Sequence, residues 1–310
     1  MNKLEPSLDV FKISAKFIYD RFPRRTIKGL GQSFLFDKNI NRRIVAAAGD
    51  LAGKVVVEIG PGPGGLTLEI LKQDVRKLYI IELDSHWANV WREVKNKFSQ
   101  TANDRMTPAF KNEQASNFDR LDIIEGDALK FDFRSLSPQI IISNLPYNVS
   151  TQLLFHWLRD FDAYEKLVLM FQKEVADRIC ASPRTKSYGK LSILAQWKAE
   201  VSKVFDLEPG SFFPPPKVKS TVLKFIPFPQ ERCVCSDRID EFAALLSRIF
   251  IHRRKIVAKS LAHFLDDPYI FLQELNLHQY TRAEEISVQN FVDLFHNYIK
   301  FLEKQQIVRH

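Results

Sequence analysis

Cysteine is scarce in this chain of 310 residues, which contains only three. They are Cys180, Cys233 and Cys235, an odd number with no framework of pairs, and this favours a reducing compartment. Cys233 and Cys235 have no second Cys/His pair at the spacing of a zinc site. The sequence therefore predicts no structural disulfide and no metal site.

Long apolar runs are also absent, and none approaches the length of a membrane span. Residues 1–28 lack the uninterrupted apolar segment of a secretory signal. Glu5, Asp9 and Asp20 are atypical of an organellar transit peptide. We therefore predict a cytoplasmic protein that has no membrane partner.

The composition is that of a globular, basic protein. Hydrophobic residues make up 45%, and 45 Lys+Arg against 37 Asp+Glu give a net charge of +8. The charge favours a polyanionic partner but equally fits a merely basic soluble protein. The length allows two domains. We predict an arm at 1–28, an α/β domain at 29–229 and a helical domain at 230–310, with the last boundary at Pro227-Phe228-Pro229.

Short apolar runs bounded by turn residues predict the strands of an α/β sheet. The predicted strands are Lys54–Ile59, Lys77–Ile81, Leu121–Glu125, Gln139–Ser143, Lys166–Phe171 and Ser220–Phe225. Apolar residues at helical spacing predict helices at Leu66–Lys72, His86–Phe98, Gln172–Ile179 and Ile239–Phe250, and a stripe from Phe291 to Leu302. Ser99–Asn117 is polar and predicts an exposed insertion.

A glycine-dense turn, Gly60-Pro61-Gly62-Pro63-Gly64-Gly65, joins the first of these strands to a helix. Such a turn lets a ligand approach the backbone closely. Gly60, Gly62 and Gly65 match the dinucleotide fingerprint formally. The two prolines remove N–H donors that a pyrophosphate would need, so the match gives little support to nicotinamide binding.

Polar side chains follow the other predicted strands. Glu82 lies 82 − 60 = 22 residues after Gly60 and is suited to accept from ribose hydroxyls, although a surface glutamate is the plain alternative. Asp127 follows the next strand, where it can accept from an adenine amine. Asn144 follows the strand after that. The strand ends therefore form one polar row along one rim of the sheet.

Asn144-Leu145-Pro146-Tyr147 combines an amide, an exposed carbonyl and a flat ring. Pro146 biases Leu145 toward an extended backbone, which can turn a carbonyl toward a pocket. These groups suit a planar base that carries an exocyclic amine. Two acceptors on that amine would aim its lone pair at an electrophile, and no strong general base is needed.

Basic residues occur beside aromatic ones in two further places. Arg184, Lys186 and Lys190 surround Tyr188, and this loop can grip a phosphate backbone and stack on a base or be an ordinary loop. Phe212 and Phe213 precede three prolines and can form a stacking platform or fill the core. A further basic patch, Arg253-Arg254-Lys255, is predicted on a helix.

Taken in order, these motifs resemble the adenine dimethylase family of ribosomal RNA, from about Gly31 to Leu302. The motifs are Gly31-Gln32-Ser33-Phe34-Leu35, Glu58-Ile59-Gly60-Pro61-Gly62, Gly126-Asp127-Ala128-Leu129, Asn144-Leu145-Pro146-Tyr147, Phe171-Gln172-Lys173-Glu174-Val175, Phe212-Phe213-Pro214-Pro215-Pro216-Lys217-Val218 and Arg253-Arg254-Lys255. The resemblance implies a seven-stranded Rossmann-like methyltransferase fold with a small helical C-terminal domain that binds RNA. It also implies S-adenosylmethionine (SAM) as methyl donor.

The acceptor that the resemblance implies is a pair of adjacent adenosines near the 3′ end of small-subunit rRNA, in a pre-ribosomal particle, acted on by a monomer. Relatives that modify large-subunit rRNA usually carry isoleucine where Leu145 stands. The implied cofactor residues are Gln32, Ser33, Phe34, Leu35, Gly60, Gly62, Glu82, Leu83, Asp127, Ala128 and Asn144. The implied catalytic residues are Asn144, Leu145, Pro146, Tyr147 and Phe212, with Tyr147 and Phe212 on either side of the base.

Two other hypotheses stay open. The first is a non-catalytic RNA-binding relative that keeps the fold, against which the intact tetrapeptide and glycine turn argue. The second is a nicotinamide oxidoreductase, against which the missing hydride-transfer residues argue. The insertion at Ser99–Asn117 departs from the family pattern but leaves the motifs untouched.

Overall fold

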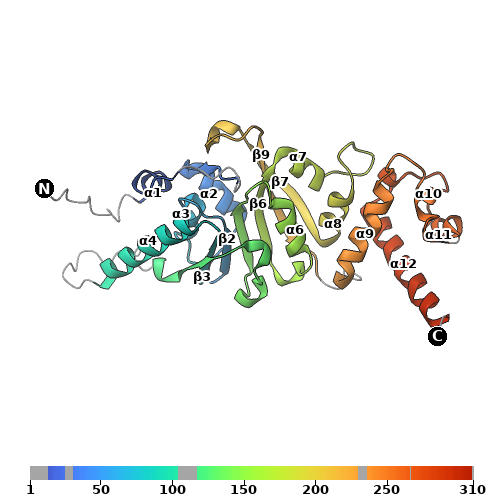
Figure 1. Cartoon of the computed structure of the whole chain (residues 1–310), viewed down its shortest axis with the longest axis horizontal. Coiled ribbons are helices and arrows are strands. Elements are labelled where there is room, and N and C mark those ends of the chain that lie inside the picture. The colour runs from blue at the N-terminus through green and yellow to red at the C-terminus, as the bar shows by residue number, and fades with distance from the viewer. Residues whose placement is uncertain (1–12, 25–30, 104–116, 230–235, 266, 309–310) are drawn as a thin grey trace. The chain divides into compact units, whose positions relative to one another are not determined.

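The computed structural model describes residues 13–24, 31–103, 117–229, 236–265 and 267–308 (Figure 1). The chain divides into two compact units. Unit 1 contains residues 1–154, 163–173 and 203–224, and unit 2 contains 155–162, 174–202 and 225–310. Among the described residues, no helix is both long and apolar enough to cross a membrane.

A seven-stranded sheet forms the centre of the fold. Its strand order is β4-β3-β2-β5-β6-β9-β7. The bounds are β2 Val55–Ile59, β3 Lys77–Glu82, β4 Leu121–Glu125, β5 Ile140–Asn144, β6 Lys166–Gln172, β7 Ala199–Leu207 and β9 Ser220–Pro227. The pairs β4–β3, β3–β2, β2–β5 and β5–β6 are parallel. The predicted α/β fold is confirmed.

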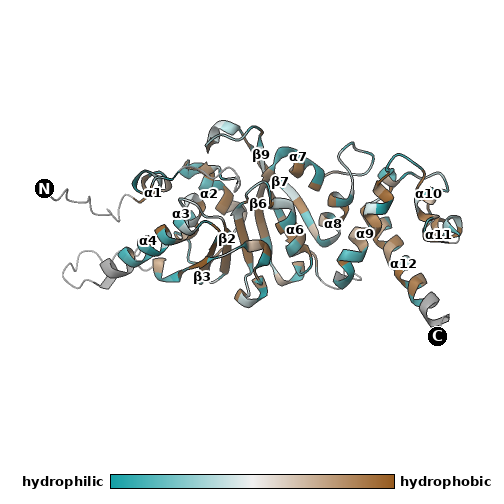
Figure 2. Cartoon of the chain, in the orientation of Figure 1, coloured by the Kyte–Doolittle hydropathy of each residue, from teal (hydrophilic) through white to brown (hydrophobic). Residues whose placement is uncertain are grey.

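The apolar runs became strands because the sheet is buried. Every residue of β2 is buried, as are the five central residues of β6, and Figure 2 colours these strands as hydrophobic. The six predicted strands are present within a residue or two at each end. The seventh, β7, was missed because it lies at the edge of the sheet, where most of its side chains are partly or fully exposed.

Among the described residues, four α-helices lie wholly within unit 1: α1 Ala15–Arg21, α2 Lys38–Ala47, α3 Gly65–Ile70 and α4 Ser85–Asn103. Asp37 caps α2, since its Oδ1 accepts from the Asn39 and Ile40 N–H groups at 2.7 and 3.3 Å. Helix α3 ends two residues before the predicted end, and α4 continues five residues beyond Phe98. The predicted insertion thus begins as helix, and its residues 104–116 lie outside the described residues.

The long helices of unit 2 are α8 Lys190–Lys198, α9 Ile239–Phe250 and α12 Val288–Val308, with the shorter α10 Val257–Leu261 and α11 Pro268–Glu274. Helices α6 (Ser150–Leu158) and α7 (Lys173–Ile179) begin in unit 1 and continue into unit 2. Phe242 packs between Trp197 and Phe295, with ring centroids 5.0 and 4.6 Å away. The apolar stripes of α9 and α12 are therefore core.

Unit 2 corrects one prediction and leaves another open. Arg253-Arg254-Lys255 lies in a turn between α9 and α10 and not on a helix, because α9 ends at Phe250. The described part of the predicted domain 230–310 lies within unit 2, which also takes in 155–162 and 174–202. The predicted domain boundary at 229 stays a prediction.

Candidate active site

A pocket in unit 1 opens where the chain reverses its direction of progress across the sheet. From β2 the chain proceeds to β3 and β4 on one side, and β5 returns to the other side of β2. Ligand crevices of open α/β sheets form at this switch point, beyond the carboxyl ends of the strands. The pocket has an empty volume of about 1070 Å³, open to solvent. It is lined from residues 31–153, so it belongs to unit 1 alone.

The glycine-loop half of the pocket consists of Gly60–Gly65, Glu58 and Glu82. Gly60, Gly62 and Gly64 have φ of 63°, 51° and 88°, values that L side chains rarely adopt. A Cβ on Gly64 would lie 2.0 Å from the Trp91 ring. The Trp91 indole N–H in turn donates to the Gly62 carbonyl at 2.8 Å. This loop must therefore be glycine-rich to fold against α4 at all.

Glu82 is buried, with 5% of its surface exposed, and its carboxylate closes the glycine loop. Its Oε2 accepts from the Gly62 N–H at 3.2 Å and its Oε1 accepts from the Asp84 N–H at 2.8 Å. Burial raises the pKa of Glu82 to about 7, although these two N–H bonds act to lower it. The plain alternative of a surface glutamate is thereby excluded.

Glu58 is a second buried carboxyl group in this half of the pocket. Its place in the motif Glu58-Ile59-Gly60-Pro61-Gly62 indicated no particular role for it. It accepts from the Thr67 hydroxyl at 2.7 Å. Burial raises its pKa to about 8, and the nearby Glu82 raises it further. Glu58 is therefore largely protonated at neutral pH, which keeps two carboxylates from being charged side by side.

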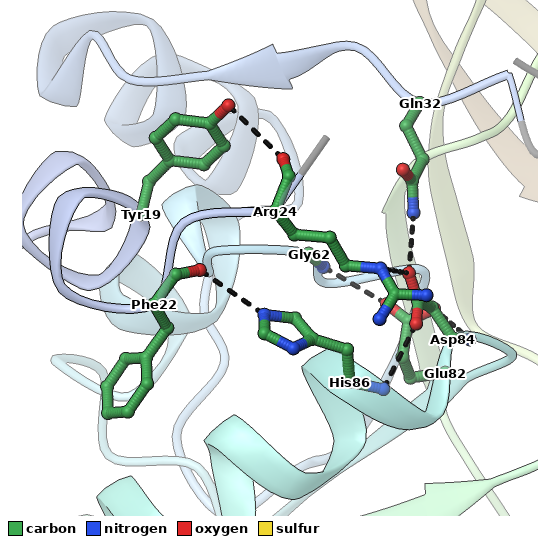
Figure 3. Close-up of polar contacts among 8 residues, drawn as sticks. All are labelled: Tyr19, Phe22, Arg24, Gln32, Gly62, Glu82, Asp84 and His86. Atoms are coloured by element: carbon green, nitrogen blue, oxygen red, sulfur yellow. Dashed lines mark hydrogen bonds and ion pairs between the residues drawn. The ribbon is translucent and has the colours of Figure 1, made fainter. Parts of the chain in front are cut away.

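Asp84 connects the glycine-loop half to Arg24, which lies just after helix α1 (Figure 3). Its Oδ2 lies 3.1 Å from Arg24 Nε and accepts from the Gln32 amide nitrogen at 3.3 Å. Its Oδ1 accepts from the His86 N–H at 3.0 Å. Neither Arg24 nor Asp84 was identified from the sequence. The spacing of Asp84, two residues before the helical His86, was the available signal for a helix cap.

The tetrapeptide half of the pocket consists of Asn144–Tyr147, directly after β5. The Asn144 amide nitrogen donates to the Ser33 carbonyl at 3.0 Å. Because the Asn144 amide nitrogen is hydrogen-bonded within the protein, the amide oxygen remains as the acceptor for a ligand. Leu145 is 1% exposed, so its side chain anchors the turn. The Tyr147 hydroxyl hydrogen-bonds to the Ser220 hydroxyl on β9, which fixes the ring.

The other predicted cofactor residues also line the pocket. Gln32, Ser33, Phe34 and Leu35 enter it beside β1 (Phe34–Leu35), where the buried Asn41 donates to the Leu35 carbonyl at 3.1 Å. Leu83 lies at the rim with 55% of its surface exposed, and Asp127 and Ala128 lie beyond β4. Asp127 Oδ1 accepts from the Leu129 N–H at 3.0 Å.

Phe212 is not among the residues that line the pocket. It is 4% exposed, packs in the core of unit 1, and pairs with Leu35 through the β1–β8 ladder, where β8 is Phe212–Phe213. Its neighbour Phe213 is 49% exposed. The structure therefore brings Tyr147 to the pocket but not Phe212, whose role against the base stays a prediction.

Tyr188 does not offer a stacking face, which excludes that alternative for the loop. Its side chain is 1% exposed, and its hydroxyl donates to the Ile286 carbonyl at 2.9 Å within unit 2. Arg184, Lys186 and Lys190 are exposed around it. The basic residues around it left a stacking aromatic as one alternative, but the ring centroid lies 6.3 Å from that of Phe250 and the ring is part of the core of unit 2.

The described residues contain no candidate metal site. Within the parts of the chain that the structure describes, no group of three His, Cys, Asp or Glu side chains gathers closely enough to hold a metal ion.

Comparison with known proteins finds a family and relatives that match most of the chain. The model of a family described as ribosomal RNA adenine dimethylase matches residues 25–300. Ribosomal RNA small subunit methyltransferase A of Rhodospirillum rubrum is 42% identical over 269 residues, covering 86% of each chain. The protein of that name from Sinorhizobium medicae is 40% identical over 272 residues, covering 86% of this chain and 90% of the relative.

Two solved structures are similar to the whole fold. A dimethyladenosine transferase from Plasmodium falciparum is 26% identical with a TM-score of 0.70, covering 86% of this chain and 98% of the other. The 23S rRNA methyltransferase ErmE is 19% identical with a TM-score of 0.58, covering 85% and 98%. The second likeness concerns the fold alone.

Proposed function

The chain belongs to the ribosomal RNA adenine dimethylase family, and from that premise we propose that its pocket binds SAM and methylates N6 of adenosine in small-subunit rRNA. The observation that carries the proposal is the meeting of Glu82 and Asn144 in one pocket. Glu82 is a buried acceptor at the end of β3, and Asn144 is a partly exposed amide at the end of β5. Hydride transfer to or from nicotinamide does not require an amide held in place by the Ser33 carbonyl.

The residues present fit SAM. Glu82 supplies acceptors for ribose hydroxyls, the exposed Leu83 side chain supplies an apolar surface for the adenine ring, and Asp127 supplies an acceptor for its amine. The glycine loop allows close approach because three of its residues have positive φ. SAM supplies an electrophilic methyl group when bound.

The tetrapeptide half is suited to hold the acceptor. The N6 lone pair of adenine is delocalised into the ring and is a poor nucleophile. The Asn144 amide oxygen and the Leu145 carbonyl oxygen accept the two N–H bonds of N6, which favours a tetrahedral nitrogen whose lone pair is free to attack. Such positioning contributes several kcal/mol, and up to about 7–11 in the best intramolecular cases.

No residue is needed as a strong base. The methylated nitrogen is acidic, so its proton passes to water. The base must leave its stack to reach the pocket, at a cost of a few kcal/mol. Stacking on the Tyr147 ring offsets that cost by about 1–3 kcal/mol. A monomethylated amine then re-enters for the second transfer. It has one N–H left, so only one of the two acceptors accepts a bond from it, and the pocket must accommodate the added methyl group.

The basic turns of unit 2 are the proposed contact for rRNA phosphates. Arg253 is tied into its own unit, because it donates to the Lys186 carbonyl and lies 3.7 Å from a Glu284 oxygen. Arg254 and Lys255 are exposed. We expect the double charge reversal R254E/K255E to weaken rRNA binding and lower the slope of log affinity against log salt by about 2, one per lost phosphate contact. Filter binding at several salt concentrations measures this, and an unchanged slope means that the turn is simply solvated.

We further propose that the acceptors are two adjacent adenosines near the 3′ end of the rRNA, that the substrate is a pre-ribosomal particle, and that the enzyme is a cytoplasmic monomer. The test is mass spectrometry of nucleosides after incubation of the chain with SAM and unmethylated small subunits. Dimethyladenosine at two neighbouring positions supports the proposal. No modified adenosine in any ribosomal substrate would leave the non-catalytic RNA-binding hypothesis.

A further inference from the structure

Helix α1 and the residues after it form an arm, residues 15–24, that packs within unit 1 beside the glycine-loop half. Ile18 is fully buried in the core, and the Tyr19 ring stacks on Trp87 with centroids 6.2 Å apart. His86 Nε2 lies 3.2 Å from the Phe22 carbonyl oxygen, and the Tyr19 hydroxyl donates to the Arg24 carbonyl at 3.4 Å (Figure 3). The arm precedes the residues that the family model matches.

The arm ends in a cation that reaches a buried carboxylate. Arg24 Nε lies 3.1 Å from Asp84 Oδ2, and the Asp84 side chain is 1% exposed while that of Arg24 is 35% exposed. A buried carboxylate needs a charge partner or hydrogen-bond donors, since without them burial is strongly unfavourable. Gln32 donates to the same oxygen at 3.3 Å. Arg24 and Gln32 therefore share one acceptor, as Figure 3 shows.

Asp84 in turn contacts Glu82. Its N–H donates to Glu82 Oε1 at 2.8 Å, and its negative charge raises the pKa of Glu82. Glu58 on β2 is a further ionisable group near Glu82, and His86 in the first turn of α4 contacts Asp84 through its backbone N–H. Arg24 supplies a positive charge beside Asp84, and Asp84 is the charged neighbour that acts on Glu82.

We propose that Arg24 is a positioning residue for the methyl donor: it neutralises Asp84 and thereby holds Gln32 and Glu82 in place for the nucleoside. This inference rests on the proposed cofactor. It adds a residue to the site that touches neither the donor nor the target base. Its influence passes through Asp84, which binds Gln32 through its side chain and Glu82 through its backbone.

The experiment compares R24Q with K16Q in the full chain. Lys16 lies on the same arm and forms an exposed pair with Asp20 at 2.7 Å, so K16Q removes the same charge without touching Asp84. SAM dissociation constants are measured by calorimetry from pH 6 to pH 9. The ratio of variant to wild type cancels the titration of SAM itself.

For R24Q we expect the dissociation constant to rise about fivefold near pH 6, because Asp84 without its charge partner disfavours the ionised form of Glu82. The ratio should shrink toward pH 9, where Glu82 is ionised in both proteins. The rate at saturating SAM should stay within about twofold, because Arg24 does not contact the acceptor half. K16Q should match wild type throughout.

The second variant distinguishes positioning from loss of the arm. In R24Q/D84N the buried charge is gone, while the asparagine oxygen can still accept from the His86 N–H, so SAM affinity should return to within about 1.5-fold of wild type. A deficit that D84N does not reduce, or an R24Q ratio near one at every pH, overturns the inference. If wild type itself does not bind SAM, the proposed cofactor falls and this inference with it.

Discussion

The glycine-loop half of the pocket is buried and held by backbone N–H groups, whereas the tetrapeptide half is half-exposed and held by two side-chain bonds. Glu58 and Glu82 are 2% and 5% exposed, and both have raised pKa values. Asn144 and Tyr147 are partly exposed and bonded to Ser33 and Ser220. Substitutions in the first half should therefore alter folding and pH dependence, and those of Asn144 and Tyr147 in the second should alter turnover and binding of the target base.

Asn144→Ala makes the largest change expected from the tetrapeptide half. Loss of the acceptor for N6 should reduce turnover by about 10²–10³-fold, as removal of one preorganised hydrogen bond does elsewhere. The free energy of unfolding should change little, since the side chain is partly exposed. Single-turnover methylation and calorimetric SAM binding measure the two effects. Asn89→Ala, exposed on α4, is the control. Dimethyladenosine formed at the wild-type rate would remove Asn144 from the mechanism.

Gly64→Ala tests whether the glycine-loop half is coupled to folding. The new Cβ meets Trp91 at 2.0 Å, and φ is 88°. Overpacking and backbone strain together should lower the free energy of unfolding by about 3 kcal/mol. Urea denaturation measures it. Gly210→Ala is the matched control, because a Cβ there meets nothing within 4 Å. Equal stability of the two variants would contradict the packing argument.

Glu82→Gln should weaken SAM binding by about 1.5–3 kcal/mol, the value of a hydrogen bond to a charged group. Wild-type affinity should fall as pH falls through about 7, because a protonated Glu82 loses acceptor capacity. The variant should lack this component of the pH dependence. Calorimetry across pH 5.5–8.5 tests both, with Glu125→Gln as control. Glu125 is the strand-end residue of β4 that pairs in register with Glu82.

Tyr147→Phe should have the smallest effect, because the stacking ring remains. Loss of the bond to Ser220 loosens the orientation of the ring and should cost about 0.5 kcal/mol, the low end of the range for a hydrogen bond. Activity should fall less than about threefold, whereas Tyr147→Ala should raise the KM for RNA about tenfold through lost stacking. Steady-state assays with varied RNA separate the two. A severe loss in Tyr147→Phe would assign the hydroxyl, and not the ring, to the acceptor.

The central strands were predictable because short apolar runs bounded by turns are typical of the buried strands of a parallel sheet. The strand-end row of Glu82, Asp127 and Asn144 was likewise predictable, since parallel strands end at one edge. Edge strand β7 was not, because its exposed side chains carry no apolar pattern. The pairing of Arg24 with Asp84 joins residues 60 positions apart, and no local pattern encodes such a contact.

Tyr188 and Phe212 show the same limit at the level of side chains. Sequence placed both in polar or proline-rich loops, where aromatic rings can face either way. The structure buries both rings. Which way a loop aromatic points depends on whether the neighbouring core has space for it, and that space is set by residues elsewhere in the chain.

The buried carboxyl group of Glu58 couples folding to the binding of a proton. Its pKa is about 8 in the folded chain and 4.5 ordinarily, so between those values the folded protein holds a proton that the unfolded chain releases. The free energy of unfolding therefore falls as pH rises through this window. Heat measured on melting should then depend on the ionisation enthalpy of the buffer that takes up the proton, with phosphate and Tris giving different values.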